Sequence, residues 1–143
     1  MAEGAGGGLS VEAANGLLTE LFAPWVLDLG LSVETCAPDG VTMRMTFDEK
    51  LCRIGGTVCG QALMAFADTC MVIVNSAALG GFRDMATVGQ NTSFFRPVVG
   101  SDVIARGRVL KPGRALMFSE VTLLADGDER PAAHITSTYA LAP

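Results

Sequence analysis

An apolar stretch at residues 54–82, which contains one charged residue, Asp68, constrains the fold more than any other feature of the chain. Small and apolar side chains at helical spacing predict a long buried helix, which we expect to open at Gly55-Gly56 and to close at Gly80-Gly81. Polar residues interrupt the run too often for a membrane span, so the helix suits the core of a domain. An ionised carboxylate is costly to bury unless it is paired or protonated, which makes Asp68 the first candidate for a functional residue.

The length and composition of the chain indicate one globular domain that associates with copies of itself. Its 143 residues suffice for one hydrophobic core. Half of the residues are hydrophobic and 17% are charged, which excludes global disorder. So much apolar surface is hard for one small domain to hide, so we expect an oligomer. The net charge of −5 argues against nucleic acid and anionic membranes as partners.

Cysteine and histidine usage predicts a cytoplasmic protein without a structural metal. The four cysteines have no C-x-x-C spacing and the chain holds one histidine, His134, so neither a zinc site nor a disulfide framework is indicated. The N-terminal segment lacks the basic and apolar regions of a signal peptide. A reducing cytoplasm is the compartment that we expect.

The remaining segments predict one short helix and six strands. Residues 1–9 are predicted to be a flexible tail, and residues 10–143 a single domain in which Ser10 caps a helix that ends before Pro24. Alternating side chains and turn residues predict strands at 25–38, 41–47, 86–98, 102–111, 115–125 and 132–142. This order predicts an α+β domain in which a curved antiparallel sheet wraps one central helix.

Gly60 stands at the start of the long helix, where backbone N–H groups lack intrahelical partners and the helix dipole is positive. Without a side chain it lets a substrate carbonyl approach those donors, as in an oxyanion site. Asp68 lies further along the same helix, roughly 12 Å away at a rise of about 1.5 Å per residue. One carbonyl cannot touch both groups of one helix, so we expect an active site shared across a dimer with antiparallel helices.

The segment "GGTVCGQALMAFADT", residues 55–69, is similar to the helix signature of hotdog-fold acyl-CoA thioesterases of the phenylacetate-degradation (PaaI-like) type. That signature is Gly-x-x-His-Gly-Gly, followed seven residues later by the catalytic Asp. The likeness continues through residues 90–141 and covers most of the chain from Val41 onwards. The resemblance implies a hotdog fold and the hydrolysis of an acyl-CoA, with coenzyme A as part of the substrate and no metal or redox cofactor.

The resemblance also implies roles for single residues. Asp68 falls on the carboxylate that acts as general base or nucleophile towards the thioester, and Gly60 on the glycine whose N–H polarises the carbonyl. Thr87 falls where relatives often place a hydroxyl that orients the attacking water. Two residues of the signature differ, since Cys59 replaces the usual His and Gln61 replaces the second Gly.

Several residues around this signature are candidates for substrate binding. Arg53 stands where relatives often have Asn, and the usual His and Asn help to position substrate. Cys59 could act as a nucleophile at the helix start or be a small apolar side chain. Gln61 could bind substrate or cap the helix. His134 lies on a strand face with threonines, which favours a structural role.

A basic cluster, formed by Arg106, Arg108, Lys111 and Arg114, stands out in an acidic chain. Lys111 and Arg114, on a predicted turn, are the candidates for contacts with the phosphates of coenzyme A, and the alternative is a solvated sheet surface.

Together, the resemblance and the expected shared site predict a homodimeric or tetrameric acyl-CoA thioesterase. The competing hypotheses are a hotdog protein that binds acyl-CoA without turnover and, less favoured, a hotdog dehydratase.

Overall fold

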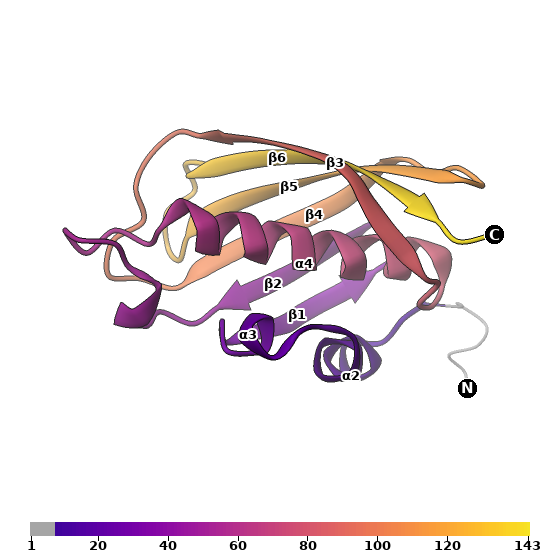
Figure 1. Cartoon of the computed structure of the whole chain (residues 1–143), viewed down its shortest axis with the longest axis horizontal. Helices are drawn as coiled ribbons and strands as arrows, with labels where there is room; N and C mark the ends of the chain where they lie inside the picture. The colour runs from indigo at the N-terminus through magenta and orange to yellow at the C-terminus, as the bar shows by residue number, and fades with distance from the viewer. Residues whose placement is uncertain (1–7) are drawn as a thin grey trace.

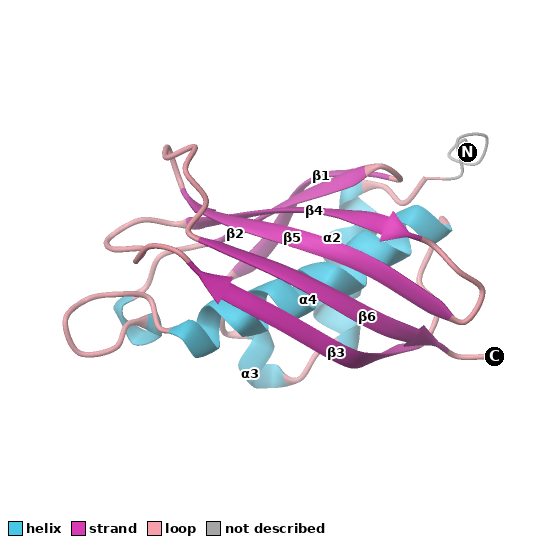
Figure 2. Ribbon diagram, turned by 90° about the horizontal axis from the view of Figure 1, so that it is seen from above, coloured by secondary structure: helices cyan, strands magenta, loops and turns pink. Residues whose placement is uncertain are grey.

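The computed structural model describes residues 8–143 and has the architecture of a hotdog fold. Six antiparallel strands form one curved sheet in the order β1-β2-β4-β5-β6-β3, and the long helix α4 lies along its concave face (Figure 1). Viewed from above, the strands cross over α4 (Figure 2). The elements are α2 (Val11–Leu21), α3 (Pro24–Leu27), β1 (Leu31–Ala37), β2 (Gly40–Met45), a 3₁₀ turn (Glu49–Leu51), α4 (Gly60–Leu79), β3 (Met85–Phe94), β4 (Val103–Lys111), β5 (Leu116–Ala125) and β6 (Ala133–Leu141). The predicted fold class is confirmed.

Helix α4 begins later than the sequence predicts. Gly55 and Gly56 have φ angles of +102° and +83°, which a right-handed helix cannot contain, and they form a turn ahead of the helix. The helix starts at Gly60, and Cys59 is its N-cap. The predicted end is confirmed, because Gly80 adopts the left-handed conformation with φ of +83°.

The core of the domain forms where α4 meets the sheet. In β6 every second residue is buried, from Ala133 to Leu141, and β4 and β5 alternate in the same way over most of their length. Gly107 lets α4 lie close to the sheet, because a Cβ there would be 2.6 Å from Val74 Cγ2 and 2.9 Å from Val121 Cγ2. By length and composition α4 could span a membrane, yet 67% of its apolar window is buried within the fold, as in a core helix.

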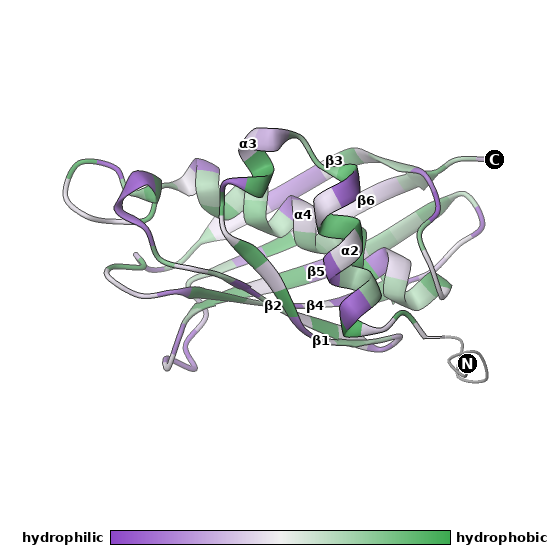
Figure 3. Ribbon diagram, turned by 90° about the horizontal axis from the view of Figure 1, so that it is seen from below, coloured by the Kyte–Doolittle hydropathy of each residue, from purple (hydrophilic) through white to green (hydrophobic). Residues whose placement is uncertain are grey.

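The N-terminal helices lie on the same side of the sheet as α4 (Figure 3). Ser10 caps α2 as predicted, since its side chain accepts a hydrogen bond from the N–H of Ala13. The strand predicted at residues 25–38 is wrong in its first part. Pro24 opens the short helix α3, and the strand begins only at Leu31. Of the predicted tail, residues 1–7 lie outside the described part of the chain.

Candidate active site

Asp68 lies where α4 meets β3 and β6, and two hydroxyl groups bind its carboxylate. Thr87 Oγ1 donates to Asp68 Oδ1 over 3.1 Å, and Tyr139 Oη donates to the same oxygen. Tyr139 Oη also reaches the backbone oxygen of Asp68, at 2.9 Å. The register of β3 and β6 sets Thr87 opposite Tyr139. The two strands therefore present both hydroxyls to one turn of the helix.

A mostly apolar pocket of about 320 Å³ surrounds this carboxylate, and we call it the Asp68 pocket. It is lined by Phe22, Trp25, Val26, Ala65, Asp68, Thr69, Val72, Met85, Ala86, Thr87 and Tyr139. Three of these side chains, Phe22, Trp25 and Val26, come from the end of α2 and from α3. No sequence pattern connects these two helices with the site. Apolar walls around one carboxylate suit an apolar group of a ligand whose polar end meets Asp68.

Gly60 lies in a second pocket, of about 400 Å³, which we call the Gly60 pocket. It is lined by Arg53, Thr57, Val58, Gly60, Leu63, Phe94, Phe95, Arg96, Pro97 and Val98. As the first residue of α4, Gly60 has an N–H for which residues 8–143 provide no acceptor. A Cβ at this position would lie 3.4 Å from the ring of Phe94, in space that glycine leaves open. The N–H is thus available to a ligand oxygen.

Of the other residues predicted to bind substrate, Cys59 has a structural role, whereas Arg53 and Gln61 are exposed. Arg53 lines the Gly60 pocket and donates to the backbone oxygen of Ile54 over 3.1 Å. Cys59 caps α4, because its Sγ accepts a hydrogen bond from the N–H of Ala62 at 3.4 Å. Gln61 is exposed in the first turn of the helix. Of the two roles predicted for Gln61, that of the helix cap therefore belongs to Cys59.

Comparison with known proteins establishes the family. The model of the thioesterase superfamily matches residues 55–132, which hold Gly60, Asp68 and Thr87. The chain belongs to this superfamily. It is a thioester hydrolase of the hotdog fold, as the sequence resemblance implied.

Solved structures and a curated relative agree with this assignment. The crystal structure of a "putative thioesterase" from Silicibacter sp. TM1040 is 31% identical, with a TM-score of 0.84 over 94% of this chain and 93% of that chain. Thioesterase HI1161 of Haemophilus influenzae, at 20% identity and a TM-score of 0.82, shares the fold over 93% of this chain and 90% of its own. "Putative esterase Ta0293" of Thermoplasma acidophilum is 24% identical over 124 residues, which are 85% of this chain and 92% of that protein.

The basic cluster of this thioesterase lies apart from both pockets. Lys111 and Arg114 are exposed near the turn between β4 and β5, and neither lines the Gly60 or the Asp68 pocket. Arg106 pairs with Glu129 at 3.2 Å, and Arg108 with Glu120 at 2.8 Å. Within one chain the cluster is thus divided between ion pairs on the sheet and two exposed side chains at the turn. Phosphate contacts by Lys111 and Arg114 stay a prediction.

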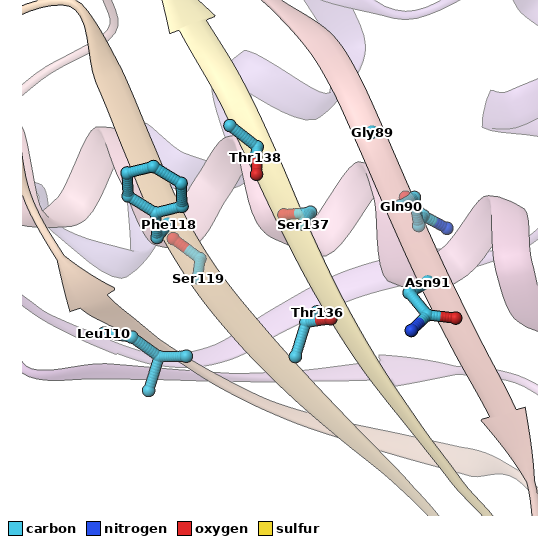
Figure 4. A pocket seen from close by; sticks show the side chains of 9 residues that line it. All are labelled: Gly89, Gln90, Asn91, Leu110, Phe118, Ser119, Thr136, Ser137 and Thr138. Atoms are coloured by element: carbon cyan, nitrogen blue, oxygen red, sulfur yellow. The ribbon is translucent and has the colours of Figure 1, made fainter.

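The convex side of the sheet carries a separate hollow of about 380 Å³. It is bordered by residues of β3, β4, β5 and β6, among them Asn91, Leu110, Phe118 and Thr136 (Figure 4). His134 also lies on this side and pairs with Glu120 at 2.9 Å. Its ring holds the pKa of the Glu120 carboxyl below the usual range. The structural role predicted for His134 fits this position.

Tyr139, Arg96, Phe22 and Trp25 are the site residues that sequence reasoning missed. Alternation along the last strand places the single tyrosine of the chain on the helix side, but no pattern indicates which helix residue it reaches. Among residues 8–143, no three His, Cys, Asp or Glu side chains come together as metal ligands. The site chemistry that can be derived is that of one carboxylate, two hydroxyls and a free backbone N–H.

Proposed function

We propose that this thioesterase hydrolyses acyl-CoA at a site shared by two subunits. Asp68 of one subunit activates water, and the N–H of the partner subunit's Gly60 polarises the thioester carbonyl. The proposal includes the phenylacetate-degradation (PaaI-like) subtype, which rests on the signature at residues 55–69. It also includes a cytoplasmic location, which the four free cysteines support.

The observation that carries the shared site is the separation of the two groups along α4. Asp68 and Gly60 belong to one helix, lie roughly 12 Å apart along its axis and line different pockets. A carbonyl held by the Gly60 N–H of one chain is therefore out of reach of that chain's own Asp68. A second copy with its α4 antiparallel would bring a second Asp68 towards the first Gly60.

Strand β3 supports association at this side of the domain. It pairs with β6 along one edge, and within residues 8–143 its other edge has no strand partner. Exposed apolar side chains lie on this strand, with Val88 63% and Phe94 50% accessible. A long edge strand with exposed apolar side chains is a surface on which another chain can add. Because Thr87 of this strand contacts α4, a partner there would set the two long helices near each other.

The proposed hydrolysis begins with the attack of water on the thioester carbonyl. An oxygen of Asp68 takes a proton from water while the water oxygen bonds to the carbonyl carbon, and the Gly60 N–H donates to the oxyanion. The intermediate then collapses, the C–S bond breaks, and the CoA thiolate leaves and takes up a proton. The alternative is direct attack by Asp68 to form an anhydride that water hydrolyses. After one turnover in ¹⁸O-water, label on Asp68 identifies the anhydride route with water attack at the Asp68 carbon. Direct attack by water puts all of the label in the acid.

Coenzyme A would be held at the Gly60 end of the site. Arg53 and Arg96 border this pocket and offer guanidinium groups to anionic parts of a ligand. Lys111 and Arg114 would contact its phosphates. The chemistry runs on a carboxylate and a backbone N–H, so we expect CoA release to continue after exhaustive treatment with EDTA.

The decisive experiment measures CoA release from short, long and aromatic acyl-CoAs by wild type and Asp68→Asn. We expect turnover of at least one substrate class and a loss of kcat on the order of a thousandfold in Asp68→Asn, which is isosteric but cannot take a proton. Binding of acyl-CoA without any release of CoA would replace the proposal with a non-turnover acyl-CoA binder. Full activity of Asp68→Asn would remove Asp68 from the mechanism.

A further inference from the structure

Tyr139 is a buried side chain with a direct connection to the proposed reacting group. It is 2% exposed, lies on β6 and faces α4. Its hydroxyl spans two acceptors of one residue, the backbone oxygen of Asp68 at 2.9 Å and the side-chain oxygen Oδ1. A donor shared between these two atoms fixes the side-chain torsions of Asp68 as well as the position of its carboxylate.

The two carboxylate oxygens of Asp68 differ in the hydrogen bonds that they accept. Oδ1 accepts from Tyr139 and from Thr87, whereas no donor among residues 8–143 reaches Oδ2. Burial, together with the neighbouring Asp68 charge, raises the pKa of Tyr139 well above its ordinary value. The phenol therefore keeps its proton and donates at any pH at which the enzyme would work.

We propose that Tyr139 is a positioning residue which, with Thr87, holds Oδ1 of Asp68 so that Oδ2 is the oxygen that reacts. Oδ2 takes the proton of the attacking water while the water oxygen bonds to the thioester carbon. Thr87 thereby orients the carboxylate itself. This inference rests on the proposed function, because it assigns an atom and a support to Asp68 in that reaction.

Tyr139→Phe tests the inference, since it keeps the ring in the core and removes only the hydroxyl. We expect kcat to fall on the order of tenfold to a hundredfold, as for a lost hydrogen bond to a charged group, while KM stays within about threefold. The ionised carboxylate loses a donor, so the acidic limb of the pH profile of kcat should move to higher pH. Packing alone would not move that limb.

Matched variants and a readout without substrate complete the test. Ser137→Ala changes a buried hydroxyl on the same face of β6 for which the described residues hold no hydrogen-bond partner, and it should leave kcat and the pH profile unchanged. In protein with ¹³C-labelled aspartate, the carboxyl resonance of Asp68 should move in Tyr139→Phe relative to wild type at neutral pH and stay in place in Ser137→Ala.

The outcomes separate this inference from the proposed function. A Tyr139→Phe variant with the kcat, acidic limb and Asp68 carboxyl resonance of wild type overturns the positioning role, even where Asp68→Asn is inactive. An active Asp68→Asn overturns the proposed function, whatever Tyr139→Phe does. If Tyr139→Phe fails to fold, Thr87→Val removes the other Oδ1 donor at an exposed strand position, and a wild-type kcat in that variant also contradicts the inference.

Discussion

Cys59 stands where the thioesterases that this chain resembles have histidine, and its role at the residue scale is that of a helix cap. Its backbone is extended, with φ of −71° and ψ of 152°, and its Sγ accepts the N–H of Ala62. A thiol is a weak acceptor, whereas serine and threonine are among the preferred N-caps. The geometry accounts for position 59 without a nucleophilic thiol.

Substitution of Cys59 separates capping from catalysis. We expect Cys59→Ser to release CoA at the wild-type rate and to unfold at an equal or higher urea concentration, because a hydroxyl accepts more strongly. Cys59→Ala should lose less unfolding free energy than the typical value of about 1 kcal/mol for a serine or threonine cap, because the thiol accepts more weakly. A Cys59→Ser protein that folds but releases no CoA would contradict this account and identify the thiol as the nucleophile.

At the scale of elements, Gly107 sets how closely α4 packs on the sheet. A Cβ at Gly107 would fall within 3 Å of methyl groups on both α4 and β5. Gly107→Ala should therefore lower the free energy of unfolding by about 1–3 kcal/mol through overpacking. Gly16→Ala is the control, because within residues 8–143 and apart from its chain neighbours and the backbone of α2 no atom lies within 4 Å of the added Cβ. We expect Gly16→Ala to gain up to about 1 kcal/mol, and urea titrations of both variants measure the difference.

Arg44 joins several strands on the convex side of the sheet. Its guanidinium lies 2.6 Å from Glu34 of β1 and 2.8 Å from both Asp102 and Asp126, which border β4 and β5. Asp102 also accepts the N–H of Phe47 at 2.7 Å. Two hydrogen bonds lower the pKa of the Asp102 carboxyl from its ordinary 3.8. The bond from the Phe47 N–H has the larger effect, and the bond from Arg44 has the smaller one.

This network predicts a sensitivity to acid that can be measured. The folded protein holds the Asp102 proton less tightly than the unfolded chain, so the stabilisation is complete above about pH 4 and disappears as the pH falls through the lower folded pKa. Asp102→Asn should be less stable than wild type at pH 7, and the difference should shrink towards pH 2. Urea unfolding at a series of pH values is the measurement, and parallel curves for the two proteins would argue against the network.

At the scale of the whole molecule, a site shared by two subunits predicts complementation between inactive variants. Gly60→Pro removes the N–H at the first helical position, where proline fits and the extended Cys59 precedes it. Asp68→Asn removes the carboxylate. Each should be inactive alone, but after mixing and subunit exchange the mixed dimer holds one intact site. An equal mixture should recover about a quarter of wild-type activity.

The controls decide where the site lies. Gly60→Ala keeps the N–H but adds a Cβ 3.4 Å from the ring of Phe94, so it should keep more activity than Gly60→Pro, and the difference between the two variants separates loss of the donor from crowding of the pocket. A double variant with Asp68→Asn and Gly60→Pro in one chain, exchanged with an equal amount of wild type, leaves each site of the mixed dimer without one half, so the wild-type activity should fall by about half. If the single variants show no recovery although exchange is verified by mass, the site is contained in one subunit.

The α+β architecture, the central helix and the candidate carboxylate are readable from the sequence, because burial period and turn residues are local properties of the chain. The first turn of α4 and the start of β1 were misplaced, because Gly55-Gly56 were assigned to the helix and residues 25–30 to the strand. The meeting of Tyr139 and Thr87 at Asp68 is a tertiary property. These contacts depend on the register of β3 with β6 and on where α4 packs against the sheet. They join residues up to 71 positions apart. The lone charge in an apolar helix is visible in the sequence. The two hydroxyl groups that bind its carboxylate come from β3 and β6, and no local sequence pattern predicts how these two strands align.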